Sequence, residues 1–230
     1  MRDAVIVAID GPAGSGKSTV SRLVAQKLGL LYIDTGAMYR ALTLKAMDRG
    51  IDIEDTEALV SMAKTTNIDL VQDLRALSVI LDGTDVTSRI RTLDVTQQVK
   101  YIARVPGVRQ EMVKKQRLLA EKKGAVLEGR DIGTIVFPDA QYKFYLDADF
   151  EKRVERRYKE LLEAGQPVGR EDIRQDIIAR DRSDMMREVG PLKKADDAVS
   201  VDTTSLTIDG VVNELLSHIE KGPSRVRGRR

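Results

Sequence analysis

A glycine-rich segment near the start of the chain has the residue types and spacing that bind phosphate. It follows an apolar run at 4–10 and reads Gly11-Pro12-Ala13-Gly14-Ser15-Gly16-Lys17-Ser18-Thr19. Glycines let the backbone curl so that successive N–H groups point inward, and a helix that opens at Lys17 adds its positive dipole end. In this GxxxxGK(S/T) pattern, Lys17 reaches the β- and γ-phosphates and Ser18 places its hydroxyl on Mg²⁺. We therefore expect a nucleoside triphosphate with Mg²⁺; a plain glycine-rich turn between a strand and a helix is the alternative.

Three further segments place arginines in short polar contexts, at 34–40, 128–134 and 180–187. The first two follow predicted strands, and ligands of open α/β sheets bind outside the carboxyl ends of the strands. Guanidinium groups suit phosphate because they can donate two parallel hydrogen bonds. We therefore expect a second, phosphate-bearing ligand to face the glycine-rich loop, although a surface salt bridge is an equal alternative for any single arginine.

Alternating apolar and amphipathic segments must position these residues. Short apolar runs bounded by turn residues predict buried parallel strands at 4–10, 30–34, 125–128, 142–147 and 198–202. Helical periodicity predicts helices at 17–28, 37–48, 107–123, 150–164, 170–186 and 206–221. This alternation is typical of a doubly wound α/β fold.

Two segments depart from that alternation. Between about 69 and 91, short apolar runs are separated by polar turns such as Asp82-Gly83, which predicts a small antiparallel β lobe inserted into the core. The C-terminal segment 223–230 carries four arginines and no acidic residue, so we expect a disordered tail. For this tail, we favour a solvated charged segment over one that contacts RNA or another polyanion.

Composition excludes several kinds of chemistry. The 230 residues are 42% hydrophobic, enough for one large α/β domain or a core with inserted lobes. Cysteine is absent and His218 is the single histidine, so thiolate nucleophiles, disulfides and histidine-based pairs are excluded. The formal net charge is +2, of which the tail arginines contribute +4, leaving −2 for residues 1–222. No signal peptide or membrane span is predicted, and we expect a cytoplasmic protein.

The sequence resembles the bacterial cytidylate kinases of the nucleoside monophosphate kinase family over essentially the whole chain to about Gly222. The resemblance is carried by the glycine-rich loop, the inserted sheet and the segments 34–40, 129–140 and 180–187, with Pro191-Leu192 after them. It implies transfer of a phosphoryl group from ATP to CMP or dCMP with Mg²⁺. It also implies an α/β fold whose P-loop NTPase core is a five-stranded parallel sheet flanked by helices.

The resemblance further implies how the chain is divided. We expect one kinase domain over 1–222, with its core at about 1–66, 107–149 and 165–222. A monophosphate-binding lobe is expected at about 67–106 and a helical lid at about 150–164. A monomer with small-molecule substrates, and with no membrane or stable nucleic-acid partner, is expected.

Arginines at family positions are the candidates for phosphate contacts. The resemblance implies that Arg40, Arg130 and Arg187 hold the acceptor phosphate or the transferring group, and that the Thr35 hydroxyl donates to the acceptor phosphate. Phosphoryl transfer asks a protein mainly to align two phosphates and neutralise charge, so arginines, a lysine and Mg²⁺ suffice. Lys17, Arg130, Arg157 and Arg187 are therefore the predicted catalytic residues.

Base and ribose contacts are implied for four more residues. Asp131 and Arg109 occupy the base-reading positions, and a carboxylate beside an arginine complements the edge of cytosine better than that of uracil. A helix cap is the alternative for Asp131. Arg180 and Asp184 resemble the pair that grips the ribose hydroxyls, although an intrahelical ion pair has the same spacing. Lys100 departs from the family, where many relatives carry a small hydroxyl residue, and it either donates to the base or points outward.

Three arginines share one face of the predicted lid helix at i, i+3 and i+4. We expect Arg157 to bring charge to the transferring phosphate when the lid closes and excludes water. For Arg153 we favour a solvated face, paired with neighbouring glutamates. Arg156 lies between them in sequence and shares their helix face.

Two other functions stay open at the level of the sequence. One is a P-loop kinase for a different small acceptor, such as another nucleotide or shikimate, for which the pairing of Asp131 with Arg109 has no evident use. The other is a nucleotide-dependent switch or RNA-associated ATPase. The chain lacks an obvious apolar strand that ends in a magnesium-binding Asp near a switch segment, and Glu128-Gly129-Arg130-Asp131 is only a partial mimic.

Overall fold

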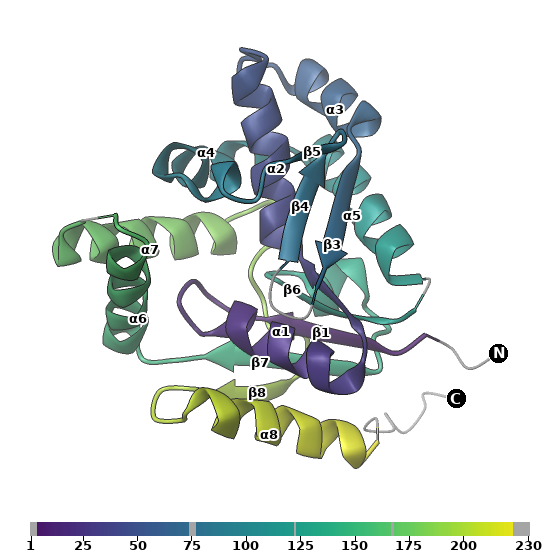
Figure 1. The fold of residues 1–230 in the computed structure, drawn as a ribbon, viewed down its shortest axis with the longest axis vertical. Coiled ribbons are helices and arrows are strands. Elements are labelled where there is room, and N and C mark those ends of the chain that lie inside the picture. Colours follow the sequence, from purple (N-terminus) through teal and green to yellow (C-terminus); the bar gives the residue numbers. More distant parts are fainter. Residues whose placement is uncertain (1–3, 74–76, 122, 167, 223–230) are drawn as a thin grey trace.

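A parallel sheet forms the centre of the molecule (Figure 1). The structure is a computed structural model that describes residues 4–73, 77–121, 123–166 and 168–222. In spatial order the strands are β2 (Leu31–Asp34), β6 (Ala125–Gly129), β1 (Ile6–Asp10), β7 (Tyr142–Asp147) and β8 (Val199–Asp202). Every neighbouring pair is parallel, so all carboxyl ends lie at one edge of the sheet. The five predicted strands and their arrangement are confirmed.

Helices cover both faces of the sheet because successive side chains of a buried strand point to opposite sides. Val7 and Ile9 join a core with α1 (Lys17–Leu28) and α8 (Ile208–Glu220). Ile6 and Ala8 join a second core with α2 (Thr35–Asp48) and α5 (Pro106–Glu121). The central strand β1 is therefore buried on both faces, as its continuous apolar run predicts, whereas the edge strand β8 buries only Val201.

A small antiparallel sheet packs beside α2 (Figure 1), as predicted for the inserted lobe. It is formed by β3 (Ile68–Gln72), β4 (Leu77–Leu81) and β5 (Thr84–Asp85). Its β4–β5 turn takes a positive φ of 48° at Asp82 and 86° at Gly83. The Asp82 carboxylate pairs with the buried Lys45 ammonium of α2, which fixes the lobe to the core.

Two helices of this region were not predicted. They are α3 (Thr56–Thr65) and α4 (Leu93–Ala103), with a 3₁₀ turn, η1 (Arg89–Arg91), before α4. The α4 sequence contains Thr and Val residues of low helix propensity, and no side chain caps its start. It buries only Val95, Ile102 and Ala103, so tertiary packing rather than local preference holds it helical.

Two helices stand together at the carboxyl edge of the sheet (Figure 1). They are α6 (Phe150–Glu163), which follows β7, and α7 (Arg170–Met185). Val154, Leu161, Ile173 and Ile177 form a small apolar core between them. The two helices therefore pack against each other as one unit.

Leu127, whose side chain is fully buried in the sheet, tests this core. Leu127→Ala should lower the free energy of unfolding by about 2–5 kcal/mol, because the substitution leaves a cavity between β6 and the α2–α5 layer. Denaturant titration measures the change. Leu118→Ala is the matched control, since Leu118 is 61% exposed, and it should change the stability by less than about 0.5 kcal/mol. Equal effects of the two substitutions would contradict the packing described here.

Candidate functional site

The glycine-rich loop lies between β1 and α1 and has the shape of a phosphate cradle. Gly11 must be glycine because a side chain there would overlap the carbonyl of Leu146 on β7, and its φ is 152°. Gly16 precedes α1, and no side chain caps the N–H groups of the first turn. These N–H groups are the usual partners of an anion at a helix start. The loop therefore offers the backbone donors that the sequence predicts.

Lys17 lies buried within this loop and faces the arginine cluster. Its Nζ donates to the carbonyl of Pro12 at 2.8 Å. Burial, reinforced by the charge of Arg130, lowers the pKa of Lys17 from 10.5 to about 7. The Glu128 and Asp184 carboxylates oppose this lowering without cancelling it, so a bound phosphate would stabilise the ammonium further.

Three carboxylates lie at the ends of neighbouring strands beside the loop. Asp10 and Asp34 end β1 and β2, Glu128 is the penultimate residue of β6, and register places Asp34 opposite Glu128. Burial, and secondarily Asp34, raises the pKa of Glu128, while the nearby Ser18 hydroxyl and Tyr32 act in the opposite direction. Tyr32 donates to Glu128 at 2.7 Å. The Ser18 hydroxyl and the Glu128 carboxylate are therefore two neighbouring oxygen donors at the start of α1.

Asp10 connects the loop to the segment after β6. Its two oxygens accept from the N–H groups of Ile132 at 2.9 Å and Gly133 at 2.8 Å. These residues begin η2 (Ile132–Val136), a short π-helix. Burial raises the pKa of Asp10 to about 6 despite these two hydrogen bonds. Asp10 thereby sets the position of Arg130 and Asp131 relative to the loop.

The arginines form a cluster around Asp184. Arg130 Nε donates to one Asp184 oxygen at 2.7 Å, and Arg187 pairs with the other. Arg180 forms no ion pair in the part of the chain that the structure describes, and burial with the charge of Arg130 lowers its pKa to about 10. The alternative interpretation, an intrahelical ion pair between Arg180 and Asp184, is therefore wrong. The cluster has more guanidinium charge than its carboxylate neutralises.

Arg109 and Asp131 meet in a buried ion pair, on α5 and just after β6. The Asp131 side chain makes no capping hydrogen bond to η2, so the alternative of a helix cap is wrong. Arg109 also donates to the carbonyl of Ala103 at 3.1 Å and lies over the ring of Tyr39, 5.4 Å from its centre. The two predicted base-reading residues thus form one rigid unit.

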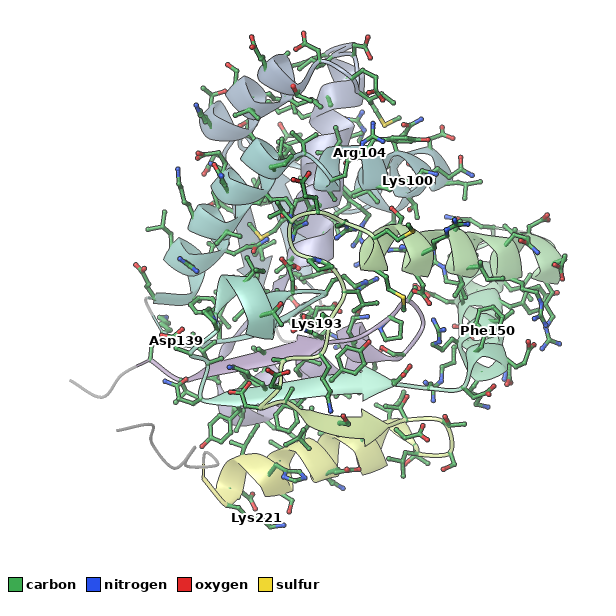
Figure 2. All side chains as sticks on the ribbon, turned by 180° about the vertical axis from the view of Figure 1, so that it is seen from behind. Lys100, Arg104, Asp139, Phe150, Lys193 and Lys221 are labelled. Carbon is green, nitrogen blue, oxygen red and sulfur yellow. The ribbon has the colours of Figure 1, made fainter. Side chains whose placement is uncertain are left out.

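The remaining acceptor-site candidates lie at the start of α2. The Thr35 hydroxyl donates to the carbonyl of Glu128 at 2.6 Å, and Arg40 pairs with Asp34 at 3.2 Å. Lys100 lies elsewhere, exposed on α4 with its ammonium 5.0 Å from the centre of the Tyr101 ring (Figure 2). Lys100 therefore points outward, and the structure does not place it at the base.

The three arginines of α6 have separate partners. Arg157 pairs with Glu160 at 2.9 Å, and it is close enough to Arg180 to lower that residue's pKa. Arg156 donates to the hydroxyl and the carbonyl of Thr203 at 2.9 and 2.6 Å. Arg153 is only 9% exposed and binds Asp181 of α7, so the interpretation of Arg153 as a solvated surface residue is wrong.

A parallel sheet, a phosphate loop and a facing arginine cluster define a P-loop phosphotransferase. The sequence profile of the cytidylate kinase family matches residues 7–221. The chain therefore belongs to the cytidylate kinase family.

Individual relatives agree with that assignment. The chain is 50% identical to a cytidylate kinase of Desulforamulus reducens over 222 residues, 96% of this chain and 100% of the relative. It is 46% identical to a cytidylate kinase of Bacillus subtilis over 221 residues, 96% of this chain and 99% of the relative. Among solved structures, an uncharacterized protein from Eubacterium ventriosum has a TM-score of 0.50 at 12% identity, covering 94% of this chain and 98% of its own; it shares the fold.

Several residues of the site were not selected from the sequence. Asp10 and Glu128 could have been selected from the sequence. Acidic residues at the carboxyl ends of adjacent parallel strands must meet at one edge of the sheet. Arg153, Asp181 and Thr203 carry no such signal, since their contacts depend on how α6, α7 and β8 dock on the loop.

The lowered pKa of Lys17 predicts that nucleotide binding takes up a proton. Above pH 7 the free Lys17 is largely neutral, whereas phosphate favours the ammonium, so the affinity for ADP should fall by up to about tenfold per pH unit between pH 7 and 9. Isothermal titration calorimetry in buffers of different ionisation enthalpy measures both effects. Lys17→Met should bind more weakly with a flat pH profile. A pH-independent affinity of the unaltered protein would contradict the prediction.

Proposed function

We propose that this protein transfers the γ-phosphate of ATP to CMP or dCMP, producing ADP and CDP or dCDP. The observation that carries the proposal is the arginine cluster around Asp184, which faces Lys17 across the carboxyl edge of the sheet. Membership of the cytidylate kinase family supports the same acceptor. A kinase for another small acceptor, or a nucleotide switch, is not favoured.

The phosphate loop would hold the donor. Its backbone N–H groups and Lys17 cradle the β- and γ-phosphates, and the Ser18 hydroxyl, with Glu128 beside it, fits a Mg²⁺ ion. When bound, Mg²⁺ supplies neutralising charge on the phosphate oxygens. Arg130 and Arg187 share the single carboxylate of Asp184, which leaves both guanidiniums able to take phosphate oxygens.

Alignment would account for most of the catalysis, because phosphoryl transfer needs little covalent participation by the protein. We assign Lys17 and Arg157 to the charge of the transferring group, and Arg40, Arg130 and Arg187 to the acceptor phosphate or the transferring group. The Thr35 hydroxyl is assigned to the acceptor phosphate, and Arg180 with Asp184 to the ribose hydroxyls. Arg157, held by a single helical neighbour, would exchange Glu160 for phosphate when the lid at 150–164 closes.

Base selectivity would come from the Arg109–Asp131 unit. The Asp131 carboxylate can accept from the exocyclic amine of cytosine, whereas uracil presents an acceptor there. A buried carboxylate facing an acceptor is unfavourable by a few kcal/mol, on the order of a hundredfold or more in selectivity. Because Lys100 is exposed, this discrimination is assigned to Asp131 and Arg109 alone.

The setting of the enzyme belongs to the same proposal. The described residues contain no helix that is long and apolar enough to span a membrane. We propose a cytoplasmic monomer, with the division into core, monophosphate-binding lobe and lid given above. The tail at 223–230 lies outside the described residues and is assigned no part in the chemistry.

Acceptor specificity tests the proposal. ADP formation from Mg·ATP is measured with CMP, dCMP, UMP, AMP, GMP and shikimate separately, beside a reaction without acceptor. We expect the rates with CMP and dCMP to exceed all others. ADP release that is equal without any acceptor would identify an ATPase and overturn the proposal.

Asp131→Asn tests the assignment of base reading. An amide can donate or accept, so the ratio of kcat/KM for CMP over UMP should narrow by about tenfold or more. Asp139→Asn is the matched control, because Asp139 is an exposed aspartate in the loop that follows η2 (Figure 2). A ratio unchanged in Asp131→Asn would remove Asp131 from the base pocket.

A further inference from the structure

The outer side of the phosphate loop is held by α6, through side chains that the mechanism above does not use. Arg153 donates to the carbonyl of Ala13 at 3.0 Å. Two residues further along the loop, the Thr203 hydroxyl donates to the carbonyl of Ser15 at 3.0 Å, and Arg156 holds Thr203 in place. Both carbonyls are therefore fixed facing outward, toward α6 and the end of β8.

Gly14, which lies between these two carbonyls, packs directly on α6. A Cβ at Gly14 would lie 2.9 Å from the carbonyl oxygen of Arg153 and 3.0 Å from its Cβ. The φ of Gly14 is 76°, a conformation that glycine adopts without strain. The first turn of α6 thus contacts Ala13 and Gly14, and Thr203, held by Arg156 of the next turn, contacts Ser15.

Holding the carbonyls orients the opposite groups of the same peptides. Because a trans peptide is planar, the C=O of Ala13 points away from the N–H of Gly14, and the C=O of Ser15 points away from the N–H of Gly16. Among the hydrogen bonds of the described residues, neither glycine N–H has a protein acceptor. These two donors are therefore left facing the cradle.

Asp181 of α7 completes the arrangement. One of its oxygens accepts from the N–H of Ala13 at 3.1 Å, and the other pairs with Arg153. Both polar groups of the Ala13 backbone are thus bound by side chains of α6 and α7. The Arg153 guanidinium also lies over the Phe150 ring at 5.4 Å, at the start of α6 (Figure 2), which restricts its rotamers.

We infer that Arg153 and Asp181, together with Thr203 and Arg156, are positioning residues that aim the Gly14 and Gly16 N–H groups at the donor phosphates. Through these contacts α6 and α7 help to shape the phosphate loop, in addition to supplying the arginines assigned to the substrates. The inference rests on the nucleotide-binding function proposed above, although it does not depend on the acceptor.

Binding of ADP to the full chain, without acceptor, tests the inference. Arg153→Met should weaken ADP binding by about tenfold to a hundredfold, the effect of losing a charged hydrogen-bond partner. The ADP affinity of Arg153→Lys should lie between those of the unaltered protein and Arg153→Met, because a lysine can still donate to the Ala13 carbonyl. The KM for CMP at saturating ATP should change by less than about twofold, because the acceptor residues are untouched. Arg182→Met, at an exposed arginine of α7, is the matched control and should leave ADP binding unchanged.

A double-mutant cycle separates a shared role from two independent ones. Arg153 and Asp181 bind the C=O and the N–H of the same residue, Ala13. The Kd of ADP for the double variant Arg153→Met/Asp181→Asn should therefore exceed the Kd of the single variant with the lower affinity by no more than about threefold. Full additivity would contradict a shared clamp. If Arg153→Met does not fold, Thr203→Val tests the second carbonyl, and it should also weaken ADP binding.

A folded Arg153→Met or Thr203→Val protein with unchanged ADP affinity would overturn the inference, and a lowered Tm alone would then mark these residues as structural. The outcome is independent of the proposed acceptor. If the unaltered protein binds ADP, the variants lose that affinity, and CMP is not phosphorylated, the positioning role stands while the proposed function fails.

Discussion

Compensation of buried charge at the carboxyl edge of the sheet governs the whole site. Arg109, Arg153 and Arg130 would repel one another and lose hydration if they stood alone, so a buried aspartate pairs with each of them. The compensation is incomplete at Lys17 and Arg180, whose pKa values both fall on burial. At Lys17, which lies in the phosphate loop, a bound polyphosphate can supply the missing negative charge.

The aspartates that hold the arginines come from few elements. Asp181 and Asp184 project from α7, and Asp131 follows β6, so docking α7 against α6 sets several guanidiniums at once. The apolar core of Val154, Leu161, Ile173 and Ile177 therefore has a functional consequence, since it fixes the spacing of charges that lie outside it. If α6 and α7 moved as a pair, their contacts with the phosphate loop and with the proposed acceptor site would change together.

The sequence predicts those features whose physics is local. Apolar runs located all five strands, and the GxxxxGK(S/T) spacing located the loop, because strand burial and phosphate binding depend on nearby residues. The resemblance brought Arg109 and Asp131 together correctly. The helix α4 was missed because tertiary packing holds it. Arg153 was misjudged because helical spacing cannot reveal that its face docks on a loop 140 residues earlier in the chain.

A crystal structure of the protein with CMP bound tests the central claim, that the arginines held by buried aspartates form the acceptor site. The account predicts the CMP phosphate against the guanidiniums of Arg130 and Arg187, and the cytosine edge against Asp131 and Arg109. CMP bound away from these residues, or with its base turned from Asp131, would contradict the account.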